Sequence, residues 1–437
     1  MMLFATPQAK KIILTMTAQT QITTLFLLLC SPFTKALHIS FHASRSTISS
    51  SPRQRITQRD VILPRPRKFR SSLLRAAANE NASSDVTNSN APCQVLLLDH
   101  ININHQKGHH SLLKSFYFHF LQCSIDPRKY ENYTAGKKTI WANIGMHQFH
   151  LPEGKPDAQV LDGKITLVYE NLHALQKRYH EYLNGENPEL DVLKGTKFDV
   201  RDIIIADDKN NGEEDMILVS DPWGNQFQIM SSSNPTSDRA ANIGSQPLME
   251  NDSPSEGLAL KDLTVHVAHG ANLGGISRFY ETVLGAPTVA SSDSHVSIAM
   301  DGQRGQTLTF RYHHDGPSAV EVKHHDFCYD NKEGEGDETV PFYPSNQGPH
   351  ISLYITNLRH AYQSASELGV LYVNPRFKRR AYTEEEAIDQ CMFRIIDIVD
   401  PLDDKREVIV RLEHEVRAVV TREGKKYKSC PLFEIPR

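Results

Sequence analysis

Four short stretches of the chain alternate apolar with polar residues, and each leads into a stretch with helical spacing. The alternating stretches begin at His100, Lys164, Asp262 and His350. A period of two is typical of a β-strand with one buried face. Because the same order of patterns recurs four times, the sequence predicts an internal repeat.

The helical stretches carry apolar residues at intervals of three and four. They cover 112–121, 172–183, 276–285 and 358–369, and this spacing predicts helices with one buried stripe. Gly285 and Gly369 stand where the last two helices should stop, since glycine accepts the left-handed conformation of a C-cap. Further alternating stretches close each unit. The predicted unit is therefore βαβββ and the fold class is α+β.

The N-terminal residues 1–90 have a different composition. An apolar run, 22–30, is too short to span a bilayer, and a basic stretch rich in Ser and Thr follows it at 37–75,. This order of signal peptide and transit peptide resembles the bipartite plastid address of algae with secondary plastids. We expect a plastid location, with secretion or mitochondrial import as alternatives, and a mostly disordered segment. The fold is expected to start near Val95.

The remaining boundaries come from composition as well. The polar, breaker-rich stretch 233–258 predicts a linker, and 421–437 is a C-terminal tail. The net charge of −4 gives no general attraction to nucleic acid,, and no membrane partner is expected after processing. Six cysteines without a CxxC pair argue against a disulfide scaffold,.

Two motifs connect the repeats with a known family. The segment FYETVLGAP, starting at Phe279, resembles the "FY…LG" helix of the vicinal-oxygen-chelate superfamily, which includes glyoxalases, bleomycin-resistance proteins and ring-cleaving dioxygenases. Asp221-Pro-Trp-Gly-Asn resembles its "DPxGN" turn, in which proline fixes φ and Gly-Asn accepts a positive φ,. The resemblance covers residues 95–420.

The resemblance implies that the modules pair around shared concave sheets. Modules one and two, 95–232, are expected to form one cupped domain. Modules three and four, 259–420, are expected to form the second. In this family the metal ligands come from the start of the first strand and from the last strand of each module.

Carrying these positions over gives candidate ligands in both domains. The second domain offers His350 and Glu407, with Asp262 or His266 as the third ligand and Glu413 as the alternative acid. Glu407 is reached by counting from Asp400, which stands where the "DPxGN" turn should be. The candidates of the first domain are His100, His150 and Gln228, with Lys164 in the fourth position. Lys164 could bind an anionic ligand in place of a metal.

The ligand set implies a metal-dependent enzyme that acts on a small molecule through vicinal oxygens. Iron, manganese, zinc or nickel would suit such donors. A dioxygenase-like activity is favoured over a glyoxalase-like one, because Gln228 and Thr309 stand where a glyoxalase would carry glutamates. The alternative is a non-catalytic binding or scaffold protein with degenerate metal sites, since a shared fold does not carry function with it.

Overall fold

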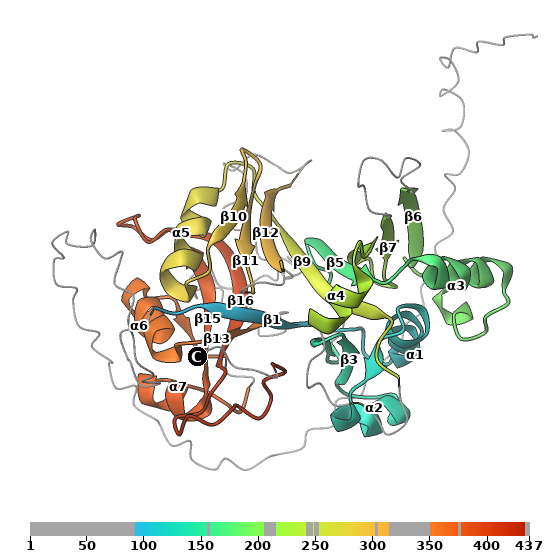
Figure 1. The fold of residues 1–437 in the computed structure, drawn as a ribbon, viewed down its shortest axis with the longest axis horizontal. Coiled ribbons are helices and arrows are strands. Elements are labelled where there is room, and N and C mark those ends of the chain that lie inside the picture. The colour runs from blue at the N-terminus through green and yellow to red at the C-terminus, as the bar shows by residue number, and fades with distance from the viewer. Residues whose placement is uncertain are drawn as a thin grey trace, which may run out of the picture. The chain divides into compact units, whose positions relative to one another are not determined.

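The computed structural model describes residues 92–154, 158–204, 216–241, 248, 253–301, 305–313, 350–374 and 377–432 (Figure 1). The expected targeting segment, 1–90, lies outside the described residues. Within the described part of the chain, no helix combines the length and the apolar character needed to cross a membrane.

Modules one and two follow the predicted order of elements. Module one contains β1 (Val95–Asn102), α1 (His110–Lys114), the π-helix η1 (Ser115–Phe120), β2 (Ser124–Ile125), the short helices η2 (Pro127–Lys129) and α2 (Tyr130–Ala135), β3 (Ile140–Ile144) and β4 (His147–Leu151). Module two contains β5 (Gly163–Tyr169), α3 (His173–Asn184), η3 (Asp191–Leu193), β6 (Asp199–Ile204), β7 (Met216–Ser220) and β8 (Gln226–Ser231).

Modules three and four repeat the same order. Module three contains β9 (Gly257–Val267), α5 (Leu273–Leu284), β10 (Thr288–Ser291), β11 (His295–Ala299) and β12 (Thr307–Tyr312). Module four contains β13 (His350–Ile355), α6 (Leu358–Leu368), β14 (Leu371–Tyr372), α7 (Glu384–Gln390), β15 (Met392–Val399) and β16 (Val408–Ala418). The expected linker includes a further helix, α4 (Pro235–Ala241).

Each of two eight-stranded sheets joins two modules. The strand order is β14-β15-β16-β13-β1-β4-β3-β2 in the first sheet and β10-β11-β12-β9-β5-β8-β7-β6 in the second. Inside every module the opening strand is parallel to the closing strand, as β1 is to β4. The predicted α+β class, with four βαβββ modules in two sheets, is confirmed.

The pairing of the modules differs from the expectation. Strand β1 runs antiparallel to β13, with Leu98 opposite Leu353, and β5 runs antiparallel to β9, with Ile165 opposite Leu263. Module one therefore shares a sheet with module four, and module two with module three. In Figure 1 the blue strand β1 lies beside the orange strand β13. The repeat pattern could not predict this, because every module offers the same opening-strand edge.

Modules that are adjacent in sequence contact one another through their helices instead. Phe116 of η1 packs against Phe227 of β8, with ring centroids 5.3 Å apart. Tyr280 of α5 shares a hydrogen bond of 2.8 Å with Nε2 of His414 on β16, and both residues are buried. The same aromatic residues that the sequence assigned to helical stripes thus fill the space between sheets.

Two helix C-caps confirm the predicted glycine stops. Gly285 ends α5 at φ +61°, and Gly369 ends α6 at φ +75°. The two positions differ in their surroundings. A Cβ at position 285 would lie 1.6 Å from the carbonyl oxygen of Cys93, whereas a Cβ at position 369 would meet nothing within 4 Å. Position 285 therefore requires glycine for two reasons: its φ is positive, and the main chain just before β1 lies too close for a side chain.

Candidate functional site

Three predicted histidines lie together on the sheet of modules one and four. His100 is on β1, His350 on β13 and His150 on β4, and β1 is the strand between the other two. The His100 ring stacks on that of His150, with centroids 3.7 Å apart, and meets the His350 ring edge-on at 5.6 Å. The sequence had assigned these residues to two different domains, and the module pairing brings them to one place.

The hydrogen bonds of these histidines leave ring nitrogens available. Nδ1 of His100 lies 2.8 Å from the Asp99 carboxylate, which favours a proton on Nδ1 and a lone pair on Nε2. Nε2 of His100 and Nδ1 of His350 are buried and have no hydrogen-bond partner within the described residues. Such unpaired buried groups cost about 1–3 kcal/mol each, and a ligand bound to them would remove this cost.

A carboxylate completes the cluster. Glu415 on β16 is paired in register with Ser352, and its Oε2 lies 3.6 Å from Nε2 of His350. Arg394 and Arg417 both hold this carboxylate through salt bridges. The side chains of Arg394 and Glu415 are only 4% and 8% exposed. The cluster is therefore a buried network in which one acid faces the histidines and two guanidinium groups compensate it.

The acid is not the one that the sequence predicted. Glu407 lies before β16 on the exposed turn, where its side chain is 76% exposed and 3.8 Å from Lys405. The alternative acid, Glu413, bonds Asn374 and Arg394. Counting from Asp400 failed because β15 and β16 span 8 and 11 residues, against 5 and 6 for β7 and β8. The longer hairpin carries its turn away from the histidines.

Burial and charge set the protonation of the cluster. Burial, followed by neighbouring cationic groups, lowers the pKa of His150 and His350 well below the usual range, and burial also lowers the pKa of His100. Burial alone would raise the pKa of Glu415, but the two guanidinium groups outweigh it and hold that pKa well below its ordinary value. At neutral pH the cluster thus presents uncharged imidazoles and an ionised carboxylate, the forms that bind metal.

An aromatic residue lies against the His150 side of the cluster. The Trp141 ring stacks on that of His150, with centroids 4.3 Å apart and an interplanar angle of 11°. Arg128 and Lys129 lie over the same indole at 4.8 and 4.5 Å. The His150 ring therefore lies between those of His100 and Trp141, and the two cationic side chains stabilise the indole,.

Three of the remaining predicted ligands lie in the other sheet, where they bond to neighbouring polar side chains. Lys164 on β5 donates a hydrogen bond to Gln228 on β8. The pKa of Lys164 is lowered, because the effect of burial exceeds the opposing effect of the nearby Asp262 carboxylate. Asp262 on β9 accepts hydrogen bonds from three hydroxyl groups, those of Thr264, Thr307 and Thr309. The predicted set of His350, Glu407 and Asp262 does not form, because Asp262 belongs to the sheet of modules two and three.

The other candidate third ligand, His266, is also separate from His350. Its Nδ1 lies 2.9 Å from Asp162, and its ring is 5.1 Å from that of His313. These three side chains offer ligand atoms within 4.8 Å of one another, but all three are half-exposed.

Sequence reasoning missed Glu415 and its two arginines, although a signal was present. Along β16 the charged residues 411, 413, 415 and 417 alternate with Val410, Leu412, His414 and Val416. A period of two places all four charges on one face. Such a row inside a strand whose other face is buried indicates a polar interior.

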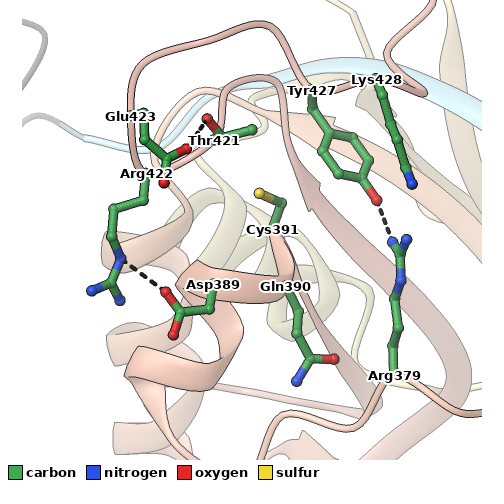
Figure 2. Close-up of a pocket in the computed structure, with 9 residues that line it drawn as sticks. All are labelled: Arg379, Asp389, Gln390, Cys391, Thr421, Arg422, Glu423, Tyr427 and Lys428. Atoms are coloured by element: carbon green, nitrogen blue, oxygen red, sulfur yellow. Dashed lines mark hydrogen bonds and ion pairs between the residues drawn. The ribbon is translucent and has the colours of Figure 1, made fainter.

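A cavity of about 350 Å³ lies beside α7 and the C-terminal segment (Figure 2). Figure 2 shows Arg379 bonded to Tyr427 and Arg422 paired with Asp389. Because both guanidinium groups are already engaged, the histidine cluster remains the stronger candidate site.

The buried histidines predict how the stability of the metal-free protein depends on pH. Burial lowers the pKa of His414 to about 4, in the same direction as the pKa values of His100, His150 and His350. The unfolded chain takes up these protons near pH 6.5, so the free energy of unfolding should fall as the pH drops from about 6.5 towards 4. Each such histidine contributes up to about 1.4 kcal/mol per pH unit. Urea unfolding at pH 7 and pH 5 measures this, and equal stabilities would contradict it.

Comparison with known proteins adds little beyond the fold. No family model and no curated protein matches the sequence. Among solved structures, glyoxalase I from Zea mays is 13% identical over 75% of this chain and 92% of its own, with a TM-score of 0.39. The 2,2',3-trihydroxybiphenyl 1,2-dioxygenase from Sphingomonas wittichii is 11% identical over 74% and 91%, with a TM-score of 0.24. These similarities carry no argument about activity. The chain's own four βαβββ modules, two to each eight-stranded sheet, form the vicinal-oxygen-chelate fold that the sequence motifs predict.

Proposed function

We propose that this protein is a metal-dependent enzyme that acts on a small molecule through two neighbouring oxygen atoms. His100, His150, His350 and Glu415 would hold the ion. The observation that carries this proposal is a pair of buried histidines, His100 and His350, each with an unpaired ring nitrogen, beside the half-buried His150 and the Glu415 carboxylate. Burying such groups is costly unless a ligand satisfies them.

The donor set suits iron, manganese, zinc or nickel. A bound ion of this kind withdraws electrons from coordinated substrate oxygens. Four protein ligands would leave two octahedral positions for a bidentate substrate. A dioxygenase-like activity is favoured over a glyoxalase-like one, because the two closing strands of this sheet supply His150 and Glu415, whereas a glyoxalase would carry a glutamate on each.

The protein's own groups have distinct tasks in this proposal. Asp99 fixes the tautomer of His100, so that Nε2 offers its lone pair,. Arg394 and Arg417 orient Glu415 and supply positive charge for an anionic substrate oxygen,. Trp141, stacked on His150 and covered by Arg128 and Lys129, holds the His150 ring in place.

One observation favours a second candidate function, a binding protein without a metal. Arg394 and Arg417 already satisfy both oxygens of Glu415, so an ion would have to compete with two guanidinium groups. In that case an anionic small molecule would occupy the space between the histidines and the arginines.

Metal analysis of the full chain distinguishes the two functions. Protein purified without oxygen or chelators should contain about one equivalent of a transition metal more than His350→Ala. The loss follows because a missing ligand typically weakens binding by orders of magnitude. His173→Ala, at an exposed position on α3, serves as the matched control and should keep the wild-type content. Equal metal content in His350→Ala and wild type would contradict the proposal. An empty site in all proteins would favour the binding protein.

A further inference from the structure

A second group of metal-ligating side chains lies outside the cluster described above. His105 follows β1, His110 begins α1, and Glu153 follows β4. The three offer one ligand atom each, and these atoms all lie within 4.8 Å of one another. In a tetrahedral zinc site with bonds of 2.0–2.1 Å, ligand atoms are about 3.3 Å apart. Small side-chain rotations would therefore close this group around an ion.

The backbone holds His105 and Glu153 side by side. The two residues form a parallel β-bridge. The His105 N–H donates to the carbonyl oxygen of Pro152 at 2.9 Å, and the Gly154 N–H donates to the carbonyl oxygen of His105 at 2.7 Å. Their relative position is thus set by the main chain and does not depend on flexible side chains.

Lys138 orients the other two side chains through its peptide groups. Nε2 of His110 donates to the carbonyl oxygen of Lys138 at 2.9 Å, and Oε2 of Glu153 accepts from the Lys138 N–H at 3.3 Å. Lys138 adopts φ +62°, a left-handed conformation that is uncommon outside glycine. These bonds leave Nδ1 of His110 and Oε1 of Glu153, 3.6 Å apart, as the free ligand atoms. Carbonyl acceptors fix metal-binding histidines in the same way.

The burial of the His105 ring is difficult to explain unless a ligand binds to it. The residue is 1% exposed, and its ring nitrogens make no well-formed hydrogen bond within the described residues, only weaker interactions with the backbone of Leu151 and Pro152. Its ring lies 4.4 Å from that of His110, edge to face. A buried imidazole without well-formed hydrogen bonds is unfavourable, whereas an ion bound to one nitrogen would satisfy the group.

We propose that His105, His110 and Glu153 bind a divalent transition-metal ion, best matched by zinc, at a site distinct from the cluster around His350. Two imidazole nitrogens and one carboxylate oxygen are ligands that zinc prefers. The Glu153 side chain is 25% exposed, so solvent can supply a fourth ligand. The ion would link the segment after β1, the start of α1 and the end of β4.

The two tryptophans of the chain make the two sites separately observable. Trp223 lies 6.2 Å from the His105 ring, whereas Trp141 stacks on His150. Co²⁺ replaces zinc in such sites and quenches nearby indole fluorescence. In the full chain, stripped of metal, Trp141→Phe leaves Trp223 as the reporter of the new site. Trp223→Phe leaves Trp141 as the reporter of the His350 cluster.

Titration of the Trp141→Phe protein with Co²⁺ tests the proposal. We expect saturable quenching of Trp223 at about one equivalent, reversed by Zn²⁺. His105→Ala or Glu153→Gln should abolish it, and the conservative second change guards against a folding defect. His109→Ala, at an exposed neighbouring histidine, is the matched control and should leave the titration unchanged. His350→Ala should also leave it unchanged, so failure of the proposed enzyme site is distinguishable. Quenching that is absent, or equal in size in the Trp141→Phe protein and in its His105→Ala and Glu153→Gln derivatives, would overturn the proposal.

Discussion

Replacing Arg394 by methionine is expected to lower the free energy of unfolding by about 3–5 kcal/mol, because the buried Glu413 would lose its counter-charge and Glu415 would keep only Arg417,. Arg394 bonds Glu413 at 2.6 Å and also pairs with Glu415, and the three side chains are between 1% and 8% exposed. Burial already raises the pKa of Glu413 despite this arginine. Urea unfolding at pH 7 measures the change.

A second ion pair on the same hairpin provides the control. Arg411 pairs with Asp397 at 2.9 Å, but these side chains are 21% and 32% exposed. Solvent screens such a pair, so Arg411→Met should cost less than about 1 kcal/mol. A loss of similar size in both variants would contradict the buried-network interpretation.

The pH dependence of the Arg394→Met effect has a defined sign. Against the effect of burial, Arg394 and Arg417 hold the pKa of Glu415 well below 4.5. The stability from this depressed pKa is present above the unfolded pKa and is lost as the pH falls. The difference between wild type and Arg394→Met should therefore be smaller at pH 4 than at pH 7.

Gly285→Ala is expected to destabilise the protein by more than about 3 kcal/mol. An alanine at φ +61° costs about 1–2 kcal/mol by itself,. Its Cβ would also overlap the Cys93 carbonyl oxygen, which is main chain and can retreat only if the segment before β1 moves. Thermal or urea unfolding of the full chain measures the loss.

Gly369→Ala separates the two contributions. This glycine ends α6 at φ +75°, and its Cβ would meet no atom within 4 Å. We expect only the backbone cost of about 1–2 kcal/mol. If Gly285→Ala cost no more than Gly369→Ala, the close approach to Cys93 would be energetically unimportant.

The sequence by itself determined the βαβββ module and the residues at which its helices end. Alternating strands, amphipathic helices and the stops at Gly285 and Gly369 depend on local patterns. The structure contains most of them where they were predicted, although β1 covers Val95–Asn102 and does not begin at His100. The positions of His100, His150 and His350 followed from the same register. Local periodicity is sufficient for these features, because it reflects which face of each element is buried.

Only the tertiary structure decided which modules share a sheet and which acid faces the histidines. Strand pairing between β1 and β13 joins segments far apart in sequence, and each module presents equivalent edges to every other. Hairpin length placed Glu415, not Glu407, beside His350, since the added residues of β15 and β16 shift the turn without changing the alternation. The group of His105, His110 and Glu153 depends likewise on a β-bridge and on the peptide of Lys138. These contacts are set by three-dimensional packing, to which a one-dimensional pattern is insensitive.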